Sequence, residues 1–168
     1  MERQGLFPRV GASGNGTAPY WFMNIKRLDH ISVVVEDMEH AVDFFTALGM
    51  TVVGEAQIEG DWVDRVNGLD DVRVDIVMLR TPDGHGQLEL TKFRKPELEP
   101  LTPSAAPPNA LGLRSIMFTV TSVADTLGRL QSHGGELIGE VAEYEDQYRL
   151  CYVRGPAGII VALAEELT

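Results

Sequence analysis

Two stretches of the chain show the same order of apolar and polar positions. Residues 28–55 align with residues 113–140 without a gap, at a constant offset of 85 positions (113 − 28 = 85). The other aligned positions often keep apolar character, and the identical pairs are Leu28/Leu113, Ile31/Ile116, Val35/Val120, Gly49/Gly134, Gly54/Gly139 and Glu55/Glu140. A repeat of this length indicates one supersecondary unit that is present twice.

In the first copy, residues 28–36 are rich in Val and Ile and predict a strand. Asp37 has the side chain of a helix N-cap, and apolar residues at helical spacing follow it until Gly49, which suits a helix end. Further strands are predicted at residues 50–57, 72–80 and 87–93, so the first copy has the order βαβββ.

The second copy repeats this order. A strand is predicted at residues 113–121, Ser122 is the expected N-cap of a helix that ends at Gly134 and Gly135, and three strands follow at 136–145, 148–154 and 159–164. Each four-stranded sheet would carry one helix on one face, which leaves its other face in need of cover. The expected fold is α+β, with two tandem βαβββ modules whose curved mixed sheets enclose a cavity and one helix packed outside each.

The chain divides into four segments. Residues 1–23 mix Gly, Ser and Pro without periodicity and are predicted to be a flexible leader. Residues 24–93 form the first module and residues 112–168 the second. The connector between them, residues 94–111, contains five prolines, which prevent helix and sheet ladders and favour an extended segment.

His30 and Glu89 are the strongest candidates for a functional pair. Alternate side chains of a strand share a face, so His30 lies with Ser32 on the face opposite Ile31, and Glu89 lies opposite the apolar Leu88. An imidazole and a carboxylate together suit a divalent metal such as Zn, Ni, Fe or Mn. The alternative is a hydrogen-bonded or salt-bridged polar pair that lines a cavity without a metal.

The sequence resembles the vicinal-oxygen-chelate superfamily, which contains glyoxalase I, methylmalonyl-CoA epimerase, extradiol dioxygenases and bleomycin-resistance proteins. The resemblance rests on the segments LDHISV (28–33), LEL (88–90) and GPAGIIVAL (155–163). It implies that His30 and Glu89 are metal ligands. It also implies two further ligands from the second module, where this chain has Ser115 and Ala162, so the expected metal site is incomplete.

Other polar and aromatic residues are candidates for a substrate pocket. Trp62 and Arg65 belong to the chemically mixed segment 59–71, which is predicted to be a loop, and Tyr148 and Arg149 flank a turn in the second module. Ser115 is the counterpart of His30 in the second module. Pocket loops favour aromatic side chains with a few polar groups, so we expect these residues to contact a small molecule.

Three functions remain open at this point, the third being metal-free enzyme chemistry that uses Glu89 alone in a dry cavity. The first is a glyoxalase-like small-molecule enzyme, a lyase or isomerase in which Glu89 moves a proton next to a metal-polarised oxygen. The second is a metal-free small-molecule binding protein that resembles bleomycin-resistance proteins. In that case the acidic charge of the chain would favour a cationic ligand.

Composition limits the partners and the compartment. The formal net charge of −11 argues against nucleic acid and against an anionic membrane surface. Cys151 is the only cysteine and no apolar run has the length of a membrane helix, so a cytoplasmic location is expected. Exposed sheet edges and the proline connector favour a homodimer.

Overall fold

The computed structural model describes residues 25–100 and 103–167. The predicted leader, residues 1–23, lies outside the described residues. The first module contains β1 (Ile31–Val34), α1 (Met38–Leu48), β2 (Thr51–Glu59), α2 (Asp61–Asn67), β3 (Arg73–Arg80) and β4 (Gln87–Lys95). The second contains β5 (Ser115–Thr119), α3 (Val123–Ser132), β6 (Glu136–Tyr144), β7 (Tyr148–Arg154), the short 3-10 turn η2 (Pro156–Gly158) and β8 (Ile160–Glu166).

Each module forms one four-stranded mixed sheet, and the two sheets have the same topology. The strand order is β1-β4-β3-β2 in the first and β5-β8-β7-β6 in the second. In each sheet the first and last strands of the module pair in parallel, and the remaining neighbours pair antiparallel. The duplication predicted from the sequence and the α+β class with two βαβββ modules are therefore confirmed.

The helices α1 and α3 begin where the sequence predicts. The Asp37 carboxylate accepts the backbone N–H of His40 at 3.0 Å, and the Ser122 hydroxyl accepts the backbone N–H of Asp125 at 3.1 Å. Each cap satisfies a backbone donor that has no partner within its own helix. Gly49 ends α1 with φ 117°, a value that favours glycine.

The segment 59–71 is not a loop throughout, because it contains the short helix α2. Val63 is the one buried residue of this helix, and it packs in a small cluster with Val72 and Val74. The Asp64 carboxylate accepts the backbone N–H of Val72 at 2.8 Å and fixes the exit from the helix. A single buried residue gives no apolar periodicity, which explains why the sequence pattern did not predict the helix.

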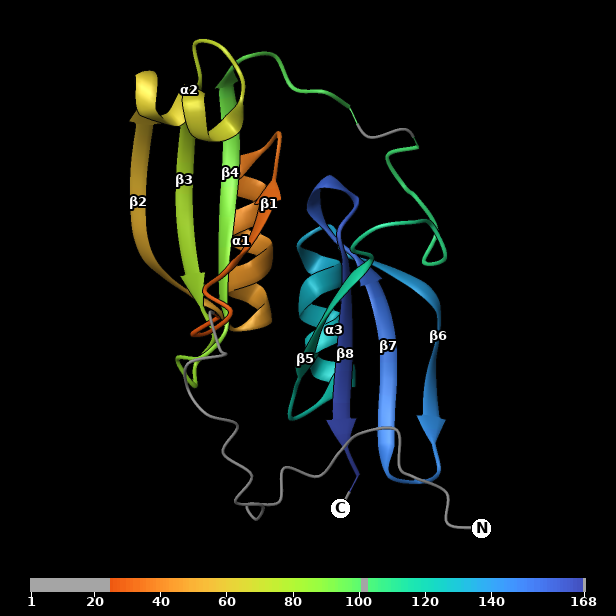
Figure 1. Cartoon of the computed structure of the whole chain (residues 1–168). Helices are drawn as coiled ribbons and strands as arrows, with labels where there is room; N and C mark the ends of the chain where they lie inside the picture. Colours follow the sequence, from red (N-terminus) through yellow and green to blue (C-terminus); the bar gives the residue numbers. More distant parts are fainter. Residues whose placement is uncertain (1–24, 101–102, 168) are drawn as a thin grey trace.

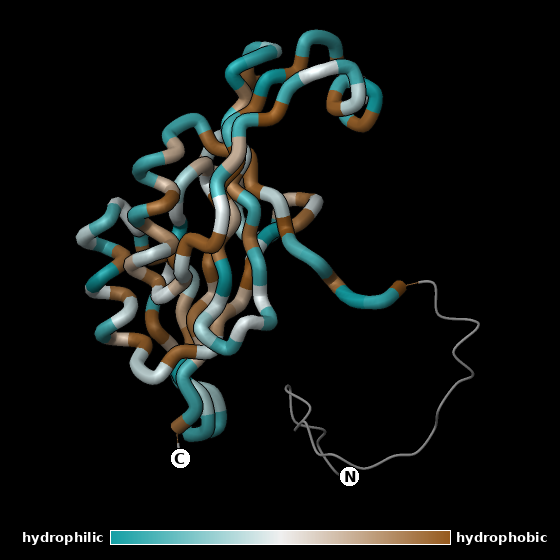
Figure 2. The backbone as a smooth tube through the Cα atoms, turned by 90° about the vertical axis from the view of Figure 1, so that its left-hand side faces the viewer, coloured by the Kyte–Doolittle hydropathy of each residue, from teal (hydrophilic) through white to brown (hydrophobic). Residues whose placement is uncertain are grey.

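The two sheets lie side by side and remain two separate open sheets. In Figure 1 the strands of both sheets form one layer, and α1 and α3 lie together behind it. Figure 2 shows the same arrangement from the side, with helices along one edge and strands along the other. One hydrophobic core runs through both modules and includes Phe44 and Phe45 of α1 and Leu130 of α3. The helices thus join the modules.

Hydrogen bonds also connect the two helices. The His40 imidazole Nε2 lies 3.0 Å from the carbonyl oxygen of His133, at the end of α3, and the Arg129 guanidinium donates to the carbonyl oxygen of Ala47, near the end of α1, at 3.2 Å. Carbonyl groups in the last turn of a helix have no partner within the helix. Each helix therefore supplies a side chain to the end of the other.

Within residues 25–100 and 103–167, no helix is both long enough and apolar enough to cross a membrane.

The described part of the connector packs on the second module. Ser104 lies close to η2, where a Cβ atom on Gly158 would come within 2.2 Å of the Ser104 carbonyl oxygen. The Arg154 guanidinium donates to the carbonyl oxygen of Ala106 at 3.0 Å and to that of Gly158 at 3.3 Å.

This contact predicts a specific loss of stability. Gly158 and Gly68 have similar positive φ values, 73° and 65°, but a Cβ atom on Gly68 would meet no other atom within 4 Å. We expect Gly68→Ala to lower the free energy of unfolding by about 1 kcal/mol, the cost of the backbone conformation alone. Gly158→Ala should lower it clearly more, because the Ser104 backbone must also move. Urea denaturation of both variants measures the difference, and equal losses would contradict the packing of the connector.

Candidate functional site

The candidate pair lies where β1 begins, beside β4. His30 directly precedes β1, and the parallel register places Ser32 next to Glu89. The His30 Nε2 atom lies 3.7 Å from Glu89 Oε2, and the two side chains are 35% and 20% exposed. These values leave the pair within reach of a small molecule from the solvent.

Two hydroxyl groups hold one oxygen of the Glu89 carboxylate. Glu89 Oε1 accepts hydrogen bonds from Ser32 Oγ at 2.9 Å and from Thr91 Oγ1 at 2.8 Å. Thr91 is buried, so its rotamer is restricted by its surroundings. Glu89 Oε1 is therefore fixed by the protein, while Oε2 is the oxygen that faces His30.

Asp29 orients the imidazole of His30. The His30 Nδ1 atom lies 3.1 Å from Asp29 Oδ2, and Arg27 donates to the other carboxylate oxygen. The hydrogen bond from Arg27, followed by that from His30, lowers the pKa of Asp29 below its ordinary value. Because an ionised carboxylate only accepts hydrogen bonds, Nδ1 must carry the proton, and in the neutral ring Nε2 then has a free lone pair.

The described residues of the second module, 112–167, contain no equivalent of this pair at the corresponding positions. The register that places Ser32 beside Glu89 in the first module places Met117 beside Ala162 in the second. Ala162 is buried and has no metal-binding atom, and Ser115 lies at the start of β5 opposite Ile160. Among the residues that the structure describes, no group of three or more His, Cys, Asp or Glu side chains could hold a metal. At this site His30 and Glu89 offer two metal-binding atoms, one nitrogen and one oxygen.

The remaining predicted pocket residues lie in different places. Trp62, which is 54% exposed, and Arg65 belong to α2. Tyr148 begins β7, and Arg149 lies on the same face of β7 as the core residues Cys151 and Val153. Arg149 forms ion pairs with two carboxylates, Glu143 at 2.7 Å and Glu165 at 3.3 Å.

Those two carboxylates raise the pKa of Arg149, chiefly through the hydrogen bond to Glu143. Glu165 also accepts the backbone N–H of Val123 at 2.7 Å, at the start of α3. A carboxylate at a helix N-terminus is stabilising, so this cluster ties β7 and β8 to the helix behind the sheet.

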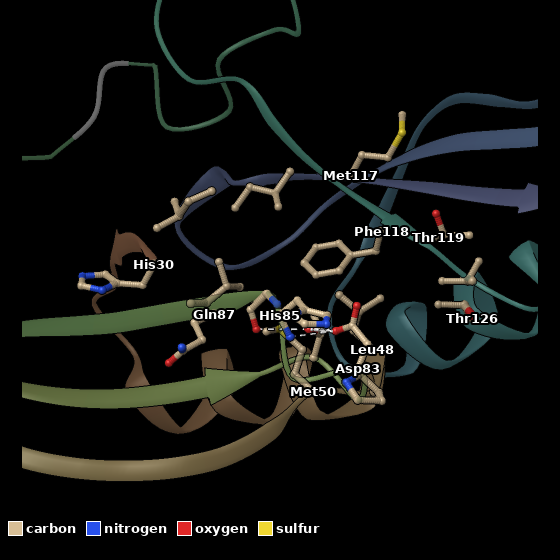
Figure 3. Close-up of a pocket in the computed structure, with 18 of the residues that line it drawn as sticks. His30, Leu48, Met50, Asp83, His85, Gln87, Met117, Phe118, Thr119 and Thr126 are labelled. Atoms are coloured by element: carbon tan, nitrogen blue, oxygen red, sulfur yellow. Dashed lines mark hydrogen bonds between the residues drawn. The ribbon is translucent and has the colours of Figure 1, made fainter. Parts of the chain in front are cut away.

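A cleft of about 650 Å³ lies between the two modules. Of the predicted site residues it is lined by His30 alone, and not by Trp62, Arg65, Ser115, Tyr148 or Arg149. In Figure 3 His30 lies toward one end of the cleft and Thr126 of α3 toward the other, with Phe118 between them. The sequence pattern did not reveal this cleft, because it arises from the packing of one module on the other.

Cys151 is buried in the core, 4% exposed, and shares the helix-side face of its sheet with Val153. It is therefore turned away from the uncovered face of the sheet. Burial raises the pKa of the Cys151 thiol, since the low-polarity surroundings disfavour the thiolate. These facts agree with the residue type's usual role as a small core side chain.

The fold and the site together define the class of this protein. Two βαβββ modules in tandem, with polar side chains on the first and last strands of one module, are the features that the sequence resemblance led us to expect. The family described as "Glyoxalase/Bleomycin resistance protein/Dioxygenase superfamily" matches residues 27–163. The chain belongs to this superfamily, whose members are small-molecule enzymes and binding proteins.

Solved structures agree with this assignment. A glyoxalase family protein from Bacillus cereus is 45% identical with a TM-score of 0.82, and the match covers 87% of this chain and 97% of that one. A glyoxalase family protein from Enterococcus faecalis is 20% identical with a TM-score of 0.57, covering 85% and 100% of the two chains.

The fosfomycin resistance protein FosX from Listeria monocytogenes is 15% identical with a TM-score of 0.56, covering 84% and 94% of the two chains. At such low identity, the likeness to FosX and to the Enterococcus protein concerns the fold alone. None of the curated proteins compared matches this chain.

The burial of Cys151 predicts low thiol reactivity. Only the thiolate is nucleophilic, and burial both raises the thiol pKa and blocks access. We expect Ellman's reagent to react with the native protein at pH 8 at a rate limited by opening of the core, and to react at once in denaturant. Fast reaction of the native protein would place Cys151 in contact with solvent and contradict this packing.

Proposed function

We propose that this protein is a glyoxalase-like enzyme of the lyase or isomerase type, in which His30 and Glu89 bind a divalent metal and Glu89 transfers a proton. One observation carries the proposal. The Asp29 carboxylate binds His30 Nδ1, so that the lone pair of Nε2 and the unconstrained oxygen of Glu89 face each other at 3.7 Å. A carboxylate behind a histidine is the usual support of a metal-binding imidazole.

The donor set fits a divalent metal. Two bonds of about 2.1 Å are long enough to span the 3.7 Å between Nε2 and Oε2. Nitrogen together with carboxylate oxygen suits Zn, Ni, Fe or Mn. Because Ser115 and Ala162 stand where the family resemblance implies further ligands, the remaining positions would be left to water and to substrate oxygens. A bound metal would polarise a substrate oxygen and acidify the neighbouring carbon.

Glu89 is arranged to move a proton. Ser32 and Thr91 hold Oε1, so the carboxylate keeps its orientation, and Oε2 would accept a proton from a carbon atom only while it is not bound to a metal. Return of that proton to a neighbouring carbon would complete an isomerisation, and loss of a leaving group in its place would complete an elimination. The hydroxyls act as positioning groups for the carboxylate.

A metal-free small-molecule binding protein is the second candidate. It is favoured by Ala162 and by the lack of a three-donor cluster in residues 25–100 and 103–167. In this case a protonated His30 would form an ion pair with Glu89 across the 3.7 Å that separates them. The acidic charge of the chain would then favour a cationic ligand.

We also propose a homodimer. The sheet faces that no helix of their own module covers carry exposed apolar side chains, among them Val34 in the first module, 46% exposed, and Tyr152 in the second, 39% exposed. Large exposed apolar surface marks interaction sites, and symmetric pairing of two copies is the commonest way to cover it.

Metal binding tests the enzymatic proposal. Isothermal titration with Zn²⁺, Ni²⁺ and Mn²⁺, supported by elemental analysis, should give one metal per chain. His30→Ala and Glu89→Gln should abolish binding, and Asp29→Asn should weaken it by about 10- to 100-fold, because the orienting carboxylate is lost. His85→Ala and Glu55→Gln, which change a histidine and a glutamate outside the pair, should bind as the unaltered protein does.

Two results would overturn the proposal. One is protein that binds no metal at all, and the other is His30→Ala protein that binds as tightly as the unaltered chain. Metal-free protein whose thermal stability rises with a cationic aromatic dye would support the binding protein instead.

The dimer is tested by light scattering coupled to gel filtration. The unaltered chain should have twice the mass of one chain at micromolar concentration, and Val34→Glu or Tyr152→Glu should give monomers, because a charge cannot be buried between apolar faces without a partner. Val66→Glu is the matched control, since Val66 is 77% exposed but belongs to α2. A monomeric unaltered chain contradicts the proposal.

A further inference from the structure

The cleft between the modules is built from parts of both. The first module contributes the residues before β1, the end of α1 and the turn between β3 and β4, and the second contributes β5 and one face of α3. β5 is an edge strand of its sheet, so no strand of its own sheet lies between it and the cleft. Any molecule in the cleft therefore contacts both modules at once.

The walls of the cleft are mainly apolar. Leu48 and Met50 line it from the first module, and Ile116, Met117 and Phe118 line it from the second. In Figure 3 the Phe118 ring lies across from Leu48 and His85 of the first module. Aromatic rings favour stacked or edge-to-face contact with other rings, and methionine adapts to irregular shapes.

The charged groups at the rim already have partners within the protein. The Asp83 carboxylate accepts hydrogen bonds from the Thr81 hydroxyl and, at 3.1 Å, from the backbone N–H of His85. Those bonds, that of Thr81 first, lower the pKa of Asp83, so it stays ionised and satisfied.

The Arg129 guanidinium likewise donates to Ala47 and, at 3.1 Å, to the Thr126 hydroxyl. Asp83 and Arg129 are thus held in place by protein groups, and most of the remaining wall is apolar.

The cleft also meets the candidate site. His30 lines it, and the same imidazole faces Glu89. Gln87 lines it as well, and lies two residues before Glu89 on the same face of β4. The apolar cleft and the polar pair thus share a border at the start of β1.

We propose that this cleft binds the planar, uncharged aromatic body of the molecule whose polar end reaches His30 and Glu89. The inference rests on the proposed function, since it names the class of substrate on which the pair would act. A cleft of about 650 Å³ lies in the range that encloses drug-sized ligands. The substrate class is therefore an aryl-substituted compound, and a small aliphatic carbonyl compound would leave most of the cleft unfilled.

Methionine methyl NMR provides a direct test with a neutral aromatic probe, N-phenyl-1-naphthylamine. Met50 and Met117 line the cleft from opposite modules, whereas Met78 pairs with Glu89 in the first sheet and does not line the cleft. With methyl-labelled methionine, the probe should shift the signals of Met50 and Met117 and leave that of Met78 in place. Single Met→Leu variants assign the three signals.

A variant with a larger side chain in the cleft tests whether the probe binds there, and a second variant serves as its matched control. His85 is exposed and lines the cleft, across from the Phe118 ring in Figure 3, so His85→Trp should fold normally and weaken probe binding by about tenfold or more, because the larger indole takes the place of the probe. Thr51→Trp introduces the same side chain at an exposed position that does not line the cleft, and should bind the probe as the unaltered chain does. Equal affinity in the two variants overturns the inference.

The outcomes for the cleft and for the metal site are independent. Shifts at Met50 and Met117 in a protein that binds no metal would retain the cleft as an aromatic site and refute the proposed chemistry at the pair. Metal binding by His30 and Glu89, with probe shifts confined to Met78 or absent, would refute the cleft inference and leave the proposed function standing.

Discussion

The parallel pairing of β1 with β4 is the constraint on which the site depends. Val33 and Val35 are buried in the core, so the alternation of the strand turns Ser32 to the opposite face. The register then sets Ser32 beside Glu89, and the two are hydrogen bonded. A shift of one residue would carry the carboxylate into the core, where an ionised group without partners is very costly. Burial of two valines thus helps to fix the position of the Glu89 carboxylate.

Comparison of the two modules shows which features both share and which differ between them. Both modules keep the strand order, the helix caps and the buried face, because each needs them to fold. The sheet face that is not covered by the module's own helix differs between the modules. Ser32 and Glu89 in the first correspond to Met117 and Ala162 in the second. Covering Ser32 and Glu89 of the first module would cost free energy if they lost their hydrogen-bond partners. Covering the apolar Met117 and Ala162 of the second would be favourable. The two halves therefore offer different surfaces on one shared framework.

Sequence reasoning succeeded where the information is local. The caps at Asp37 and Ser122, the order of the strands and the proximity of His30 to Glu89 follow from periodicity and from the pairing of a repeated unit. Helix α2 escaped prediction because a single buried side chain, Val63, leaves no periodic signal. The role of Asp29 and the cleft between the modules depend on contacts that no spacing reveals, since they are set by rotamers and by the packing of α1 on α3.

The contact between helices α1 and α3 lies next to the cleft. Arg129 donates to Ala47 at the end of α1 and to Thr126 of its own helix, which fixes the end of α1 against α3 where Leu48 borders the cleft. These two hydrogen bonds restrict the position of the guanidinium, which keeps further N–H donors. The contact that holds the modules together therefore also shapes one wall of the cleft, and His30 lines the same cleft and faces Glu89. The joint between two repeated units, rather than either unit alone, creates a cleft next to the polar pair of the first module.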